Sequence, residues 1–265
     1  MDITKKSPSI ITLLTDFGTQ DVYVGIMKGV MATINPNLNI IDLTHAIPPQ
    51  NILAARFALM NAFPYFPDHS VHVAVIDPGV GSARKGLAIK VNNSFLVGPD
   101  NGLFSGILEQ NPAQIAVELT NSQYWLNPNP SNTFHGRDIF APVAAHLASG
   151  VDIEHLGTKI DMKSLKKANI SSYQQSGKEI IGSIQYIDVF GNLITNIPAN
   201  LLKNKSWQVF IDNLLIPTGK TYSSVKKGEL VALIGSHGWL EIAVNSGSAK
   251  IQLQKNCSDQ IRIQL

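Results

Sequence analysis

The chain has 265 residues, of which 15% are charged, and its formal net charge is +2 at pH 7. So small a charge excess forms no extended basic surface for nucleic acid or anionic lipid, and no apolar stretch reaches the roughly 20 residues that a membrane-spanning helix needs. Cys257 is the single cysteine and cannot form an internal disulfide bond, and the N-terminus lacks the apolar run of a signal peptide, so we expect a soluble cytoplasmic protein.

The first 150 residues alternate short apolar runs with segments of helical periodicity. This alternation is typical of an α/β fold in which helices flank a largely parallel sheet on both faces. The first, third and fourth predicted helices follow Asp, Asn or Gly residues that we expect to cap them. The predicted strands are residues 10–14, 39–43, 71–76, 87–91, 95–97 and 114–119, and the predicted helices are residues 22–34, 50–62, 101–108 and 138–149.

The chain becomes polar over residues 151–178, and this segment is the predicted linker. Short β-rich runs at close spacing follow it, which favours a small antiparallel sandwich or barrel. Because the chain exceeds the commonest single-domain size, we predict an N-terminal α/β domain over residues 1–170 and a smaller C-terminal β domain over residues 171–265. The predicted C-terminal strands are residues 179–187, 193–197, 207–211, 230–234, 239–244 and 261–265.

Two carboxylates lie where predicted strands end. Asp16 follows the first strand and Asp77 the third, each close to a glycine. Ligands of open α/β sheets bind beyond the carboxyl ends of the strands, although a single aspartate there is more often the cap of a turn. Two at one sheet edge favour a ligand site, whereas we expect Asp100, directly before a predicted helix, to be a cap only.

Arg84 and His135 add a cation and an imidazole to these carboxylates. Arg84 follows the glycine-rich turn after Asp77, and His135 lies between Phe134 and Gly136. An acid, a fixed cation and a histidine on glycine-bordered turns are the groups needed to activate water without a metal. Taken singly, a solvated surface arginine and a solvated histidine explain these two positions equally well.

Two polar loops stand out in the second half of the chain. Asp188, Phe190 and Asn192 fall on a step from strand to turn, which fits either a hairpin or a clamp in which Phe190 stacks on a planar ligand. The second loop, residues 236–247, includes His237 and carries more polar groups than a purely structural β domain needs.

Seven motifs occur in order from about Ile11 to Leu253, and as an ordered set they are specific. They are Thr15-Asp16-Phe17-Gly18 with Asp21, Thr44-His45 with Ile47-Pro48-Pro49-Gln50, Asp77-Pro78-Gly79-Val80-Gly81, Gly98-Pro99-Asp100-Asn101-Gly102, Phe134-His135-Gly136-Arg137-Asp138, Asp188 with Phe190-Gly191-Asn192 and Thr195-Asn196, and Ser236 with Gly238 and Asn245. Together they resemble the S-adenosyl-L-methionine hydroxide adenosyltransferases, which are relatives of the fluorinating and chlorinating enzymes that use the same substrate.

The resemblance implies an α/β N-terminal domain, a C-terminal β-barrel and a homotrimer whose ligand lies between one subunit's first domain and its neighbour's second. It also implies hydrolysis of S-adenosyl-L-methionine to adenosine and L-methionine, with no cofactor and no metal. The halogenating relatives carry an insertion after the strand equivalent to residues 87–91 and lack the Asp-Arg-His set. Here only Asn92-Asn93-Ser94 intervenes, which indicates water as the nucleophile.

Carried over residue by residue, the resemblance assigns water activation to Asp77, Arg84 and His135. Asp16 corresponds to the carboxylate that accepts both ribose hydroxyls, and Asp188 and Asn192 correspond to groups at the methionine end. The other residues predicted to bind substrate are Asp21, Phe134, Phe190, Tyr222, Ser236, Asn245 and Ser246.

Two other functions fit part of the sequence. Asp16, His45, Asp77 and His135 are ligand types of a metal-dependent hydrolase, although no His-x-x-x-His or Asp-x-His pair supplies two ligands from one element. A non-catalytic protein that binds S-adenosyl-L-methionine or adenosine would keep the pocket but would have no need of the Asp-Arg-His set.

Overall fold

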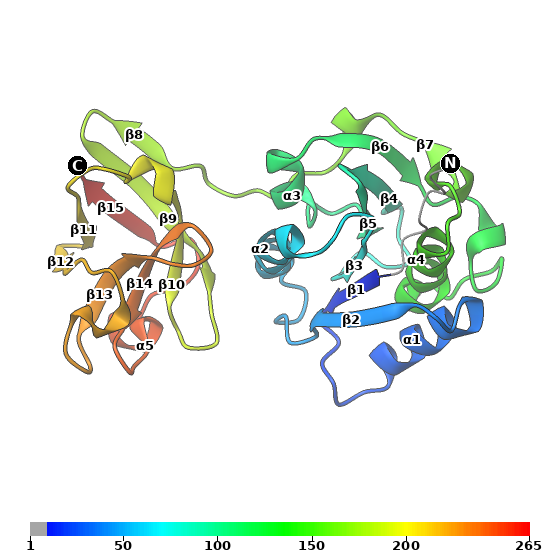
Figure 1. Ribbon diagram of the computed structural model, residues 1–265, viewed down its shortest axis with the longest axis horizontal. Helices are drawn as coiled ribbons and strands as arrows, with labels where there is room; N and C mark the ends of the chain where they lie inside the picture. Colours follow the sequence, from blue (N-terminus) through cyan, green and yellow to red (C-terminus); the bar gives the residue numbers. More distant parts are fainter. Residues whose placement is uncertain (1–9) are drawn as a thin grey trace, which may run out of the picture. The chain divides into compact units, whose positions relative to one another are not determined.

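The computed structural model describes residues 10–265, and the chain divides into two compact units, the first ending at Ala168 and the second beginning at Asn169 (Figure 1). Within the described residues no helix is long and apolar enough to cross a membrane.

A seven-stranded sheet forms the centre of the first unit, in the order β2-β1-β3-β5-β4-β6-β7. Strands β2, β1, β3 and β5 are parallel, β6 runs in the same direction, and β4 and β7 run in the opposite one, which confirms the largely parallel sheet. Only Asn92 and Asn93 separate β4 from β5, too few residues for the crossover that a parallel pair requires. The strands are β1 (Ile10–Thr15), β2 (Asn39–Thr44), β3 (Val71–Val75), β4 (Gly86–Val91), β5 (Ser94–Pro99), β6 (Ala113–Glu118) and β7 (Thr158–Lys159).

Helices cover both faces of this sheet. Figure 1 shows α1 (Tyr23–Ile34) and α4 (Ala141–Ala148) on one side, and α2 (Ile52–Ala62) and α3 (Ser105–Gln110) on the other. The α1 and α4 side is built on alternate strand residues such as Ile11 and Leu13, which are fully buried. This alternation arises because successive side chains of a strand point to opposite faces of the sheet.

The helix caps differ from the prediction. The residues before α1, α3 and α4 are Val22, Phe104 and Phe140, and none of them caps its helix through a side chain. The side chain of Asn51 instead accepts a hydrogen bond from the Ala54 N–H at the start of α2. The three predicted caps were therefore wrong, because these helices begin two or more residues after the residues expected to cap them.

The second unit is an antiparallel barrel with the strand order β12-β11-β15-β9-β10-β14-β13, and β8 pairs with β9. Thr218 bridges to Ala232 on β13, and the Ala232 N–H donates to the Pro217 carbonyl at 2.8 Å, so this seam nearly closes the barrel and confirms the predicted fold. The strands are β8 (Gln174–Ser176), β9 (Glu179–Ile187), β10 (Leu193–Pro198), β11 (Gln208–Ile211), β12 (Leu214–Ile216), β13 (Leu230–Ile234), β14 (Trp239–Val244) and β15 (Gln260–Gln264), with helix α5 (Ala249–Leu253).

Much of the predicted linker is ordered within the two units. Ile153 and Leu156 are buried in the core of the first unit, and the Lys166 N–H donates to the Asp100 carboxylate at 2.9 Å. Asp100 thus fastens the end of the first unit rather than capping a helix. The polar composition of this segment reflects an exposed surface and not a free connection.

Candidate functional site

Asp77, Arg84 and His135 form one hydrogen-bonded group in the first unit. Arg84 Nε donates to Asp77 Oδ1 at 3.0 Å, and Arg84 Nη2 donates to Asp77 Oδ2 at 2.5 Å. The same Nη2 lies 2.9 Å from His135 Nδ1. The side chains of Asp77 and Arg84 are only 5% and 6% exposed, so this ion pair is shielded from water.

Two loops bring these side chains together. Asp77 and Arg84 lie on the loop between β3 and β4, and His135 directly precedes a π-helical turn, Gly136–Phe140, that leads into α4. Gly81 has a positive φ of 76°, and a Cβ there would lie 2.3 Å from the Asn132 carbonyl oxygen. Glycine is required at this position because any side chain would push the two loops apart.

The surroundings of His135 disfavour its charged form. Burial lowers its pKa from the usual 6.5, and the nearby Arg84 cation lowers it further, while the charges of Asp77 and Asp138 act in the opposite direction. The net shift is downward, so the imidazole is neutral at pH 7. Below this cluster the Arg84 guanidinium lies 5.4 Å from the ring centre of Phe140.

Phe134 connects the His135 loop to the turn that carries Asp16. Its ring lies 5.8 Å from Phe17 and 5.3 Å from Tyr23, both edge to face. Asp16 is half-buried, and its Oδ2 accepts a hydrogen bond from the Gln50 N–H at 2.7 Å. Asp21 lies exposed in the loop before α1. Asp16 and Phe134 therefore belong to one end of the sheet, near the Asp77 group.

A polar group at the turn after β1 contains His45, which the sequence offered only as a metal ligand. The Thr15 hydroxyl lies 2.9 Å from Nδ1 of the buried His45, whose Nε2 lies 3.0 Å from Asp42 Oδ1 without the alignment of a hydrogen bond. Burial raises the pKa of Asp42, but the neighbouring side chains of Lys28 and His45 lower it by more, and the net shift is downward. The Thr44-His45 motif in the sequence pointed to these contacts, since it lies at the end of the neighbouring strand β2.

In the second unit, Asp188 and Asn192 organise a tight turn. Asp188 Oδ1 accepts from the N–H groups of Phe190 and Asn192 at 3.0 and 2.9 Å, and the Asn192 amide donates to Oδ2 at 2.9 Å. Gly191 has a φ of 82°, and a Cβ there would lie 2.0 Å from the Ser248 hydroxyl. Phe190 is 72% exposed, so the turn presents its ring to the outside.

A second polar cluster of this unit contains Tyr222 and two residues without a predicted role. The Tyr222 hydroxyl donates to Glu241 Oε1 at 2.8 Å, and His237 Nε2 lies 3.1 Å from Glu241 Oε2. Glu241 belongs to the polar loop of residues 236–247 that the sequence singled out, but no role was assigned to it, and it lies within a run of buried strand residues. Ser236 is exposed, Asn245 donates through its amide to the Val225 carbonyl, and the Ser246 hydroxyl donates to Asn245 Oδ1.

The predicted metal ligands do not converge. Over residues 10–265 no group of three His, Cys, Asp or Glu side chains could hold a metal ion. His45 faces Thr15 and Asp42, while both oxygens of Asp77 accept from Arg84. The geometry therefore gives no support to the metal-dependent hydrolase.

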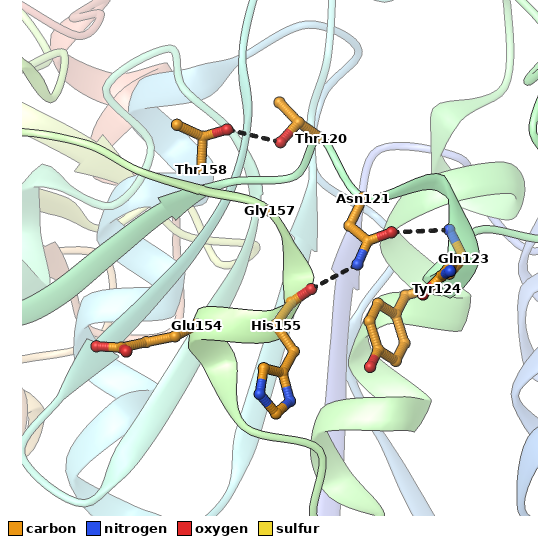
Figure 2. A pocket seen from close by; sticks show the side chains of 8 residues that line it. All are labelled: Thr120, Asn121, Gln123, Tyr124, Glu154, His155, Gly157 and Thr158. Carbon is orange, nitrogen blue, oxygen red and sulfur yellow. Dashed lines mark hydrogen bonds between the residues drawn. The ribbon is translucent and has the colours of Figure 1, made fainter.

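A polar depression of the first unit has a volume of about 680 Å³. Figure 2 shows the side chains that line it. The Thr120 and Thr158 hydroxyls lie 2.9 Å apart, and the Asn121 amide donates to the His155 carbonyl at 2.8 Å. None of the predicted site residues lines this depression, and these polar groups bond to one another. The lining residues are Thr120, Asn121, Gln123, Tyr124, Glu154, His155, Gly157 and Thr158.

Comparison of the chain with known protein families identifies the family to which it belongs. Residues 11–157 match the SAM hydroxide adenosyltransferase N-terminal domain, and residues 182–262 match the corresponding C-terminal domain. The chain belongs to the S-adenosyl-L-methionine hydroxide adenosyltransferase family. This confirms the resemblance of its seven motifs.

Full-length relatives of the family agree with this assignment. The chain is 38% identical to an (R)-S-adenosyl-L-methionine hydrolase of Thermus thermophilus, with 91% of this chain and 93% of the relative covered. It is 35% identical to the enzyme of the same name from Salinispora tropica, covering 96% and 97%. An uncharacterized conserved protein from Thermotoga maritima has the same fold, with a TM-score of 0.90 at 37% identity, covering 96% of this chain and all of the other.

Proposed function

We propose that this protein hydrolyses S-adenosyl-L-methionine to adenosine and L-methionine. The observation that carries the proposal is the contact of one arginine, Arg84, with both Asp77 and His135 at the carboxyl ends of the sheet strands. Two family members similar over their whole length are named for this hydrolysis. The three groups provide what water activation needs, and the family supplies the substrate.

In the proposed reaction a water oxygen attacks the ribose C5′ as the bond from C5′ to sulfur breaks. The sulfonium leaves as neutral methionine, and the water loses one proton, so adenosine carries a 5′-hydroxyl. Because positive charge on sulfur disappears as the nucleophile bonds, a site that excludes bulk water and holds oxygen, carbon and sulfur in line lowers the barrier.

The hydrogen bond from Arg84 determines the tautomer of His135. An arginine is always protonated and only donates, so His135 Nδ1 accepts, and the proton of the neutral ring is on Nε2. His135 therefore orients the water by donating from Nε2 to its oxygen. Asp77 takes the proton that the water loses, and Arg84 stabilises the hydroxide-like oxygen.

Substrate contacts are part of the same proposal. Asp16 accepts hydrogen bonds from both ribose hydroxyls, as acidic residues do in dinucleotide-binding folds. Asp188, oriented by Asn192, binds the amino-acid end. Further contacts come from Asp21, Phe134, Phe190, Tyr222, Ser236, Asn245 and Ser246.

We further propose a cytoplasmic homotrimer in which the site is shared between neighbouring subunits, with no metal and no cofactor. The exposed ring of Phe190 supports a shared site, because an apolar side chain of this size gains stability when another surface covers it. Sedimentation of the full chain should give a trimer. A fragment of residues 10–172 should fold, as its core is self-contained, but should be inactive.

The direct test is to incubate the purified protein with S-adenosyl-L-methionine and separate the products by chromatography. We expect adenosine and methionine in equal amounts, with the oxygen of labelled water in the adenosine. Intact substrate after prolonged incubation with folded protein would refute the proposed function.

A further inference from the structure

Asp138 is a fully buried carboxylate in the π-helical turn that follows His135. Arg137 Nε donates to Asp138 Oδ1 at 2.6 Å, and Arg137 Nη2 donates to Oδ2 at 2.9 Å. The Ser131 N–H donates to the same Oδ2 at 2.7 Å. Burial raises the pKa of Asp138, but the surrounding hydrogen bonds and charges lower it by more, so the group is ionised at pH 7.

Asp138 ties the segment that carries His135 to the chain before it. Its carboxylate holds the Ser131 N–H, and its backbone carbonyl accepts from the Leu126 N–H at 2.9 Å. His135 lies between Ser131 and Asp138, so the bond between these two residues closes a loop around it. The imidazole meets Arg84 through Nδ1 at 2.9 Å, and one hydrogen bond alone would leave the ring free to rotate about it. The closed loop supplies the constraint that this contact lacks.

The counterion of Asp138 holds the residue on the other side of His135. The Arg137 guanidinium lies 5.3 Å from the ring centre of Phe134, and its two-point pairing with the carboxylate fixes its plane. A Cβ on Gly136 would lie 3.2 Å from Phe134 Cε2, so the backbone directly after His135 packs against the same ring. The residues that flank the imidazole are therefore both fixed by packing around one ion pair.

We propose that Asp138 is a positioning residue that holds the His135 imidazole against Arg84. A buried ion pair often contributes little net stability, because the lost hydration offsets the attraction between the charges. A fixed geometry next to the water-activating group accounts better for a charge at this depth. The inference rests on the proposed function, because it gives Asp138 its part in the reaction through His135.

Two substitutions remove the pairing without a large change of shape. In Asp138→Asn the amide oxygen still accepts from Ser131, but the NH₂ group faces the Arg137 guanidinium, and both groups only donate. Arg137→Lys keeps the positive charge and loses the planar two-point pairing. Glu109→Gln is the matched control, since Glu109 accepts from Arg56 at 2.6 Å in the same unit, between the helices α3 and α2 on the other face of the sheet.

The kinetic test separates positioning from binding. Asp138→Asn should lower kcat by about 10- to 10²-fold and leave the affinity for S-adenosyl-L-homocysteine within about twofold, because a misplaced group that acts in the transition state costs rate and not affinity. The double variant with His135→Ala should be no slower than His135→Ala alone, as expected for residues that act through one group. A general weakening of the fold would slow both backgrounds equally. Glu109→Gln should match the wild type.

Nitrogen NMR of the imidazole tests the positioning without any turnover. In the wild type His135 is neutral with its proton on Nε2, so the two ring nitrogens should give two well-separated signals, which are identified by their loss in His135→Ala. In Asp138→Asn the ring should leave Arg84 and exchange between tautomers, and the two signals should move toward each other. The spectrum of Glu109→Gln should be that of the wild type.

The outcomes separate this inference from the proposed function. A folded wild type that leaves S-adenosyl-L-methionine intact contradicts the function itself. With an active wild type, an unchanged kcat in Asp138→Asn, a further loss of rate in the double variant or an unchanged imidazole spectrum would overturn the role of Asp138. If Asp138→Asn does not fold, Arg137→Lys decides alone, because an unchanged kcat in that variant overturns the inference.

Discussion

Both carboxylate oxygens of Asp77 accept hydrogen bonds from the guanidinium of Arg84, and the pair is nearly closed to solvent. Such a two-point pairing fixes the plane of the carboxylate as well as its distance. Arg84 therefore holds the Asp77 carboxylate in one orientation. Replacement of Arg84 by lysine would keep the charge but lose this planar pairing.

Removal of the water-activating groups should abolish turnover and spare binding. We expect Asp77→Asn and His135→Ala to lower kcat by about 10²-fold or more, the usual contribution of groups that handle protons, with substrate affinity nearly unchanged. Single-turnover assays and calorimetry measure the two quantities. His155→Ala is the control, as this histidine is exposed and lies outside the group. Near-wild-type kcat in both variants would remove the group from the mechanism.

Asp16→Ala should weaken S-adenosyl-L-methionine and adenosine alike, because two charge-assisted hydrogen bonds to the ribose disappear, a loss on the order of 2–4 kcal/mol. Free methionine has no ribose and serves as the internal control. Asp16→Asn retains an acceptor for the Gln50 N–H, so it separates ribose binding from the integrity of the turn. Unchanged adenosine affinity by calorimetry in both variants contradicts the assignment.

The rate should depend on pH through His135. Its pKa is lowered from the usual 6.5 by burial and by the Arg84 cation, so the ring is mainly neutral at pH 7 and above and becomes protonated in more acidic solution. A protonated ring cannot accept from Arg84. The profile of kcat/KM should therefore fall on the acid side, with its midpoint below pH 6.5. An acid limb with its midpoint above pH 6.5 would show that another group controls the rate.

A separate histidine should make the first unit sensitive to acid. His72 is fully buried, its Nδ1 lies 2.9 Å from the Thr12 hydroxyl, and its Nε2 has no hydrogen-bond partner in the described chain. Burial lowers its pKa from 6.5 to about 4. The unfolded chain therefore binds the proton first, and stability is lost as the pH falls from 6.5 to about 4, in all on the order of 3 kcal/mol.

Chemical denaturation at several pH values measures this loss. The variant His72→Gln cannot titrate, so its free energy of unfolding should change less than that of the wild type between pH 7 and 4. His155→Gln, at an exposed position, should follow the wild type. Parallel curves for His72→Gln and the wild type would exclude His72 as the acid-sensitive group.

Halide should not replace water as the nucleophile. Asp77 places negative charge where the halide would bind, and an anion beside a carboxylate in a shielded site costs several kcal/mol, of which Arg84 offsets only part. We expect no 5′-halo-adenosine by mass spectrometry in high chloride or fluoride, and full activity with EDTA. Halogenated product at the rate of adenosine formation would reject water as the preferred nucleophile, and loss of turnover on chelation would restore the metal-dependent alternative.

The sequence was sufficient for most of the strands, whereas the grouping of Arg84 with Asp77 and His135 came from the family resemblance. Strand β3 is buried along its whole length and is followed by Ile76 and then Asp77, so the carboxylate lies where the strand leaves the sheet. The direction of β4 was open to deduction too, because a two-residue connection after Val91 forces a hairpin.

Other features depend on contacts that residue type alone does not identify. The buried Glu241 is explained by Tyr222, 19 residues before it, and by His237 on the turn that precedes β14. Likewise, Asp100 resembles a helix cap in sequence, yet its acceptor is used by the N–H of Lys166, 66 residues later. Residue type alone could not identify either partner.

The π-helical turn Gly136–Phe140 lies between His135, which contacts Arg84, and α4, which packs in the core. A π-helical turn contains one residue more than an α-helical turn, and each residue rotates a helix by about 100°. The extra residue therefore changes the direction in which His135 points relative to the buried face of α4. The hydrophobic face of α4 can thus drift over evolutionary time without rotating the imidazole away from Arg84. Conversely, the orientation of this one histidine can be retuned by a single insertion or deletion while the core beneath it stays intact.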